Sequence, residues 1–216
     1  MKAIIQELKN FLKRKDIGTD SDRALLLDFQ ATLEIKPEKA IKLEKDALAQ
    51  IENITADNAR LVSNLHANLG GLYRMNGHPD LAREHMEKSI SLLDQFNLLH
   101  INDSIPQIAN YAMFLTEQQE PERGISELQK LSGIIKEYHS DDCLDYAKVQ
   151  ETLGTIYLMT ANLPQAKTHF KRAFKIYEKI WADEPEMIEA KYQEIQELYP
   201  QIGFCIGKNL SGLLTK

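Results

Sequence analysis

Histidines, cysteines and carboxylates are the side chains of this sequence that could act as metal ligands, nucleophiles or proton carriers. The six histidines form no HExxH pattern, and the two cysteines, Cys143 and Cys205, form no CxxC pair with zinc-binding spacing. The one compact group of potential ligands, His139-Ser-Asp-Asp-Cys143, falls in a predicted loop before a helix, where Asp is an ordinary N-cap. No nucleophile motif such as Gly-x-Ser-x-Gly occurs, and carboxylates on amphipathic helices usually form the solvated face. The sequence therefore predicts no enzyme, no metal site and no cofactor.

Charge and hydropathy exclude further classes of protein. The formal net charge is −6, and because the N-terminal segment MKAIIQELKNFLKRK is basic, the remainder of the chain is more acidic still. Such a surface does not suit nucleic-acid binding, which needs basic contacts to phosphates. No stretch is long enough to be a membrane span, and the N-terminal segment lacks the unbroken apolar core of a secretory signal. Together with the few cysteines, these features predict a cytoplasmic protein.

A repeat of 42 residues organises the chain. Its clearest copies lie 84 residues apart and share the motifs Leu69-Gly70-x-x-Tyr73 and Leu153-Gly154-x-x-Tyr157. A third copy lies midway between them and has Tyr111-Ala112-x-x-Leu115 in place of the motif. A weaker upstream copy has Glu44 where an apolar residue is expected, and a downstream copy diverges at Pro200.

This pattern resembles the tetratricopeptide repeat family, whose consensus is Leu-Gly-x-x-Tyr in a first helix and Ala-x3-Phe-x2-Ala in a second. Ala166, Phe170 and Ala173 match the second part of the consensus. The resemblance covers roughly residues 20–200, and the long period is similar to that of kinesin light chains and related bacterial proteins. It implies an all-α fold, a right-handed α-solenoid of antiparallel helical hairpins (TPR-like superhelix), in which small residues let paired helices approach closely.

We expect a single domain built from these hairpins. Its parts are an N-terminal capping helix over 1–19, a degenerate repeat over 20–55, repeats over 56–99, 100–140 and 141–183, and a degenerate repeat or C-terminal cap over 184–216. The amphipathic N-terminal helix is expected to cover the first repeat, with partner binding, dimerisation or membrane-surface binding as alternatives. Cys205 is expected to be a small buried residue of the C-terminal cap.

Local signals predict where the helices begin and end. Asp20 or Ser21 is expected to cap the first helix of the repeats, and Ser104-Ile-Pro-Gln107 is typical of a capping box. Gly77 is expected to end the helix that carries the Leu-Gly-x-x-Tyr motif. The prolines that are expected to open helices are Pro37, Pro79, Pro121 and Pro164.

The resemblance also implies where a ligand would bind, because in this family the first helix of each hairpin lines the concave side. The residues expected to face this groove are Asn64, Asn68, Gly71, Arg74 and Met75 in the second repeat, Ala109, Asn110 and Met113 in the third, and Lys148, Glu151, Thr155 and Met159 in the fourth.

Two features of this set favour peptide binding. Asn68 and Asn110 occupy the same position of successive repeats, and side-chain amides can both donate to and accept from a peptide backbone. The alternative is that these amides bridge adjacent helices or face solvent. Met75, Met113 and Met159 would give the groove an adaptable apolar lining, unless they belong to the core.

The sequence thus predicts a non-enzymatic scaffold that binds a protein or peptide in the groove of the solenoid. The alternative is a ligand- or peptide-responsive regulatory protein that acts through a separate effector, since the residues before the first repeat are too few for a helix-turn-helix. A homodimer formed through an end of the solenoid is a further alternative.

Overall fold

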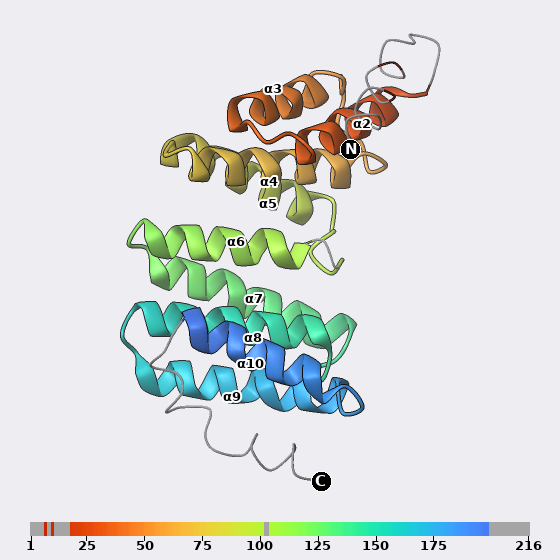
Figure 1. Cartoon of the computed structure of the whole chain (residues 1–216). Helices are drawn as coiled ribbons and strands as arrows, with labels where there is room; N and C mark the ends of the chain where they lie inside the picture. Colours follow the sequence, from red (N-terminus) through yellow and green to blue (C-terminus); the bar gives the residue numbers. More distant parts are fainter. Residues whose placement is uncertain (1–6, 8–9, 11–17, 102–103, 199–216) are drawn as a thin grey trace. The chain divides into compact units, whose positions relative to one another are not determined.

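The structure, a computed structural model, describes residues 7, 10, 18–101 and 104–198. All regular elements within these residues are α-helices (Figure 1). They are α2 (Asp20–Thr32), α3 (Pro37–Leu48), α4 (Ala59–Met75), α5 (Pro79–Gln95), α6 (Ser104–Glu117), α7 (Pro121–Tyr138), α8 (Leu144–Met159), α9 (Leu163–Ile180) and α10 (Pro185–Leu198). The chain divides into two compact units, residues 1–111 and 112–216, and the division falls within α6.

In the first unit, α2 pairs with α3 and α4 pairs with α5, and α3 packs against α4. Leu65 and Leu69 of α4 are fully buried, and Leu65 packs with Ala24 of α2 and Ala47 of α3. Burying each of these large side chains contributes about 1.5–3 kcal/mol. The core of this unit is therefore built along the inner face of α4.

In the second unit, α8 pairs with α9, while α7 packs against α8 and α10 packs against α9. Tyr146 and Leu153 of α8 and Phe170 and Tyr177 of α9 are buried almost completely. Tyr177 stacks on Trp181 at a ring-centroid distance of 4.8 Å, which closes the core near the end of α9.

Glycine allows the two helices of each central hairpin to approach closely, as the repeat consensus predicts. A Cβ atom on Gly70 would lie 2.6 Å from Cγ of Met86, and one on Gly154 would lie 2.9 Å from the ring of Phe170. Neither distance is compatible with a carbon–carbon contact, so a larger residue would require the facing side chains or the helices to shift. The sequence motif thus has a direct packing cause.

The hairpin turns repeat with the same period as the sequence. Gly77, Gln119 and Ala161 lie 42 residues apart, and they have φ angles of +73°, +66° and +58°. After each of them, a backbone N–H returns to a carbonyl five residues earlier, in the pairs His78–Tyr73, Glu120–Leu115 and Asn162–Tyr157. These are left-handed helix ends, which glycine adopts without strain and other residues do not.

Several of the predicted helix starts are confirmed and others are wrong. Pro37, Pro79, Pro121 and Pro164 all lie in the first turns of their helices. The N-cap of α2 is Thr19 rather than Asp20 or Ser21, because Thr19 and Asp22 form a reciprocal capping box with distances of 3.2 and 2.7 Å. The α8 helix is capped by Cys143, whose Sγ accepts from the Tyr146 N–H.

The predicted capping box at the start of α6 is not formed. The hydroxyl of Ser104 donates to the carbonyls of Leu99 and Ile101 instead. The side chain of Gln107 is engaged with Ser63 of α4 and does not return to the N-terminus of its own helix. A long-range polar contact has therefore taken the place of a local one.

The predicted N-terminal capping helix lies outside the described residues, apart from residues 7, 10, 18 and 19, and so do the residues predicted to form the C-terminal cap after 198, Cys205 included. None of the described helices combines the length and apolar character that crossing a bilayer requires.

Candidate functional site

A pocket of about 390 Å³ opens on α2, α4 and α6 within the first unit. We call it the amide pocket, because four of its lining residues carry side-chain amides. It is lined by Asp28, Thr32, Asn64, Ala67, Asn68, Pro106, Gln107 and Asn110. The structure thus brings together three of the predicted site residues, Asn64, Asn68 and Asn110, from the first helices of two successive hairpins.

Gln107 is fixed at one side of the amide pocket by hydrogen bonds to buried serines. Its Oε1 accepts from the hydroxyls of Ser63 and Ser89 at 2.8 and 2.6 Å, and its Nε2 donates to Oδ1 of Asn64 at 2.6 Å. Ser63 and Ser89 are themselves buried. This network sets the orientation of the Asn64 amide, so that its NH2 group remains as a donor.

Asn68 holds the opposite side of the pocket together. Its Nδ2 group donates to Oδ1 of Asp28 at 2.8 Å and to Oε1 of Glu44 at 3.2 Å, which ties α4 to both α2 and α3. This is the bridging arrangement that the sequence left open as an alternative. Asn110, at the equivalent position of the next repeat, is exposed at the rim.

The carboxyl groups of Asp28 and Glu44 form a coupled pair beside the pocket. Glu44 is only 1% exposed. Burial, the nearby charge of Asp28 and a hydrogen bond with Asp28 raise the pKa of Glu44 to about 8, and burial also raises the pKa of Asp28. Glu44 is therefore protonated at neutral pH and donates to Asp28. Without that proton, Oε2 of Glu44 would be buried with no hydrogen-bond partner among the described residues.

The repeat explains why two carboxyl groups meet at this point. Asp28 lies 42 residues before Gly70, and Glu44 lies 42 residues before Met86. Gly70 and Met86 are the pair at the closest approach of their own hairpin. The first hairpin thus has a pair of acids at the position where the next one packs a small residue against an apolar side chain.

The other predicted residues of the first unit lie outside the amide pocket. Gly71, Arg74 and Ala109 are partly buried, and a Cβ atom on Gly71 would meet nothing within 4 Å. Met75 is 81% exposed, so it does not belong to the core.

In the second unit, α10 covers part of the predicted face of α8. Glu151 accepts from the hydroxyl of Tyr177 at 2.6 Å and pairs with Lys191 of α10 at 2.8 Å. Glu151 is therefore engaged in internal contacts. Lys148 is exposed, and it lines a smaller pocket of about 300 Å³ near Trp181. Of the remaining predicted residues, Met113 and Thr155 are partly buried and Met159 is exposed.

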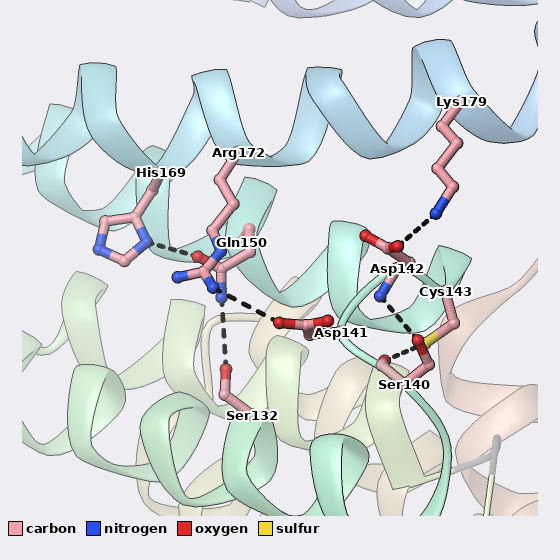
Figure 2. A network of polar contacts seen from close by, with 9 residues as sticks. All are labelled: Ser132, Ser140, Asp141, Asp142, Cys143, Gln150, His169, Arg172 and Lys179. Carbon is pink, nitrogen blue, oxygen red and sulfur yellow. Dashed lines mark hydrogen bonds and ion pairs between the residues drawn. The ribbon is translucent and has the colours of Figure 1, made fainter.

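The compact group of potential metal ligands before α8 is engaged with α9 instead. Figure 2 shows Asp141 paired with Arg172 at 3.9 Å, and Asp142 paired with Lys179. Cys143 caps α8 and donates to the carbonyl of Ser140. Over the part of the chain that the structure describes, no group of three potential ligands is arranged to hold a metal ion.

A second group of titratable side chains lies between α4 and α5. The Nδ1 atoms of His66 and His85 are 2.9 Å apart, and His85 stacks on Tyr73. Burial, followed by the effects of His85 and Lys88, lowers the pKa of His66 to about 4, and burial lowers the pKa of His85 as well. Both rings are therefore neutral at pH 7, and one hydrogen bond joins them as part of the hairpin packing.

Asp28, Thr32 and Gln107 line the amide pocket but were not identified from the sequence. Asp28 could have been found from its register, because it occupies a position where the next repeat has Gly70. Gln107 was assigned to a local cap, and nothing in its neighbourhood indicates a bond to Ser63. Thr32 carries no signal beyond its place near the end of a predicted helix.

Comparisons with known proteins find a family match for part of the chain and several structures of similar fold. The tetratricopeptide repeat model matches residues 104–179. A crystal structure of BtubC (BKLC) from P. vanneervenii is similar with a TM-score of 0.67 and 19% identity, covering 81% of this chain and 70% of that one. A Podospora anserina putative kinesin light chain with nearly identical TPR-like repeats is similar with a TM-score of 0.70 and 13% identity, covering 84% of this chain and 88% of that one. The crystal structure of MamA is similar with a TM-score of 0.56 and 16% identity, covering 81% of this chain and 87% of that one.

No curated protein matches the sequence. The family model and the similar structures agree with the helical repeat found in this chain. Residues 104–179 therefore match the tetratricopeptide repeat, and the chain has the all-α helical-repeat fold of the similar structures.

Proposed function

We propose that this protein is an interaction scaffold that binds an extended peptide across the amide pocket. The tetratricopeptide repeat is typical of proteins that mediate protein interactions, which supports the general class. The observation that carries the proposal is the pocket itself, a hollow of about 390 Å³ that collects side-chain amides from two successive hairpins. An extended peptide presents alternating N–H and C=O groups, and side-chain amides can match both.

The hydrogen bonds inside the pocket leave capacity for such a ligand. The NH2 group of Asn64 and the whole amide of Asn110 are not used in hydrogen bonds to other described side chains. Asn68 keeps its Oδ1 atom, since both of its bonds are made through Nδ2. Donors and acceptors are thus both offered to the pocket, as peptide backbone recognition requires.

Selection from a displayed peptide library, followed by Asn110→Ala, tests the proposal. Asn110 lines the pocket and is exposed, so its truncation should leave the unfolding midpoint unchanged. Losing one or two hydrogen bonds should weaken the selected peptides about three- to tenfold. The matched control is Gln129→Ala, which truncates an exposed helical amide outside the pocket. Equal binding by Asn110→Ala and the control, or no selected peptide at all, would count against the pocket as the peptide site.

The predicted cytoplasmic location and the homodimer through an end of the solenoid stay predictions.

A further inference from the structure

We infer that the amide pocket recognises a positively charged side chain, a lysine or arginine, of the bound peptide through the Asp28–Glu44 pair. The inference rests on the proposed function and specifies the chemistry of its ligand. It is carried by three observations: the pair of half-buried Asp28 and buried Glu44 at the pocket wall, the hydrogen-bonding capacity left on that wall, and the lack of any basic residue among the lining residues that the structure describes.

The carboxyl pair keeps a negative charge that the described part of the protein does not neutralise. Asp28 lines the pocket, and Glu44 lies behind it, almost fully buried, with Asn68 as the bridge between them. The groups that act on either carboxyl are the other carboxyl and the Asn68 amide. Asp28 is half-buried, so a cationic group that reaches it gains a partner that is already partly desolvated.

Among the described residues, Asn68 and Thr32 offer acceptors beside Asp28. Asn68 uses its Nδ2 group on the two carboxyl groups, which leaves its Oδ1 atom. The hydroxyl of Thr32 donates its proton to the carbonyl of Phe29, so its oxygen can only accept. Asp28 at neutral pH is likewise an acceptor. An ammonium or guanidinium group, which carries only donors, suits this wall, whereas a carboxylate or an amide oxygen does not.

The same arrangement makes recognition depend on pH. As pH rises through the pKa of Glu44, which is about 8, the pair loses its shared proton and its charge approaches −2. Within the described residues, the titratable groups at the pocket are Asp28 on α2 and Glu44 on α3, and the residues of α4 and α6 that line it are not titratable. A lysine side chain stays protonated up to about pH 10. Its affinity for the pocket should therefore increase between pH 7 and pH 9.

Two small probes that differ in charge test the inference without a known partner. Nα-acetyl-lysine methylamide and the uncharged Nα-acetyl-norleucine methylamide are titrated into the 15N-labelled full chain, and the side-chain amide resonances of Asn64, Asn68 and Asn110 are followed. The lysine probe should shift these resonances in a saturable way. Its dissociation constant should be at least about tenfold lower than that of the norleucine probe. Equal binding of the two probes, or no shift with either, would overturn the inference.

Variants of the carboxyl pair separate a cation site from a structural role. Asp28→Asn should abolish the preference for lysine, while Asp46→Asn, which removes an exposed carboxylate of α3, should not. Glu44→Gln keeps the charge that the pair has at neutral pH. It should therefore bind the lysine probe like the wild type at pH 7 but lose the rise in affinity towards pH 9. If Glu44→Gln retained that rise, the pair would not be its source.

The selected peptides separate this inference from the proposed function. If their binding depends on Asn110 but tolerates replacement of every Lys and Arg by Gln, the cation inference is overturned and the proposed function stands. If no peptide is selected while the lysine probe binds and Asp28→Asn abolishes its binding, the proposed function fails and the cation preference of the pocket stands.

Discussion

The substitution Glu44→Gln should stabilise this protein at neutral pH, although it removes a charged residue type from a buried polar network. The folded state holds Glu44 as a neutral acid that accepts from Asn68 and donates to Asp28. Glutamine has nearly the same shape, and it can accept through Oε1 and donate through Nε2 in the same way. It fits the network without having to take up a proton.

The size of the effect follows from the pKa of Glu44, which is 4.5 in an exposed chain and about 8 in the folded state. At pH 7 the unfolded chain is ionised at this residue, so folding must bind a proton. Each pKa unit corresponds to about 1.4 kcal/mol, and pH 7 lies some 2.5 units above the unfolded value, so the stabilisation by glutamine can reach about 3–4 kcal/mol.

The sign of the pH dependence is specific. Between pH 4.5 and 8 the folded state binds more protons at Glu44 than the unfolded state does, so the stability due to this group falls as pH rises. The partly buried His66 and His169 act in the opposite direction, because their lowered pKa values favour the folded state as pH increases. The difference between the wild type and Glu44→Gln cancels the histidines and isolates Glu44.

Urea unfolding followed by far-UV circular dichroism at pH 4, 5.5, 7 and 8.5 measures this difference. The two proteins should be equally stable near pH 4, and the gap in favour of Glu44→Gln should widen steadily towards pH 8. Glu178→Gln, an exposed position on α9, serves as the control and should show no gap. A glutamine variant that is less stable than the wild type at pH 7, or a gap that does not change with pH, would refute the protonated state of Glu44.

Three further substitutions, together with one control, test the packing and a turn of the second unit. Gly124→Ala should lower the free energy of unfolding by about 1–3 kcal/mol, because its Cβ would lie 2.6 Å from a backbone carbonyl oxygen of α6. Ala161→Gly should raise it by up to about 1 kcal/mol, since Ala161 has φ +58° and its counterpart in an earlier turn is already glycine. Lys191→Met should destabilise the protein by about 1–2 kcal/mol and speed hydrogen exchange in α10, because Glu151 would lose its half-buried partner. The control Lys179→Met, on the exposed surface, should change stability by less than about 0.5 kcal/mol.

The repeat could be predicted from the sequence because it expresses packing constraints that recur in each hairpin. Gly70 and Gly154 are required by the side chains of Met86 and Phe170, so the same residue types recur at the same spacing. The period also locates features that composition hides. Ala161 adopts a left-handed turn without being glycine, and only its distance of 84 residues from Gly77 would have indicated this.

The polar contacts of the amide pocket could not be predicted in the same way, because they join residues far apart in the sequence. Gln107 has the spacing of a capping residue, yet its side chain bonds to Ser63 on another helix. Asn68 was expected at the groove, and it does line the pocket, but the acids that occupy its donors lie on two other helices. Side-chain hydrogen bonds of this kind depend on the packing of several helices and leave no periodic signal.

The departure of the first repeat from the repeat consensus and the chemistry of its pocket involve the same two residues. Gly70 against Met86 gives a hairpin that is held by apolar contact and does not titrate. Replacing that pair by Asp28 and Glu44 lowers the similarity to the consensus and introduces a proton whose binding depends on pH. The two acids also accept the N–H groups of Asn68. Its Oδ1 atom is left as an acceptor, which suits a cationic ligand. The pair that departs from the repeat pattern is therefore the first place to test for ligand specificity. Glu44→Gln separates the effect of the Glu44 proton on stability and binding from that of the helix packing.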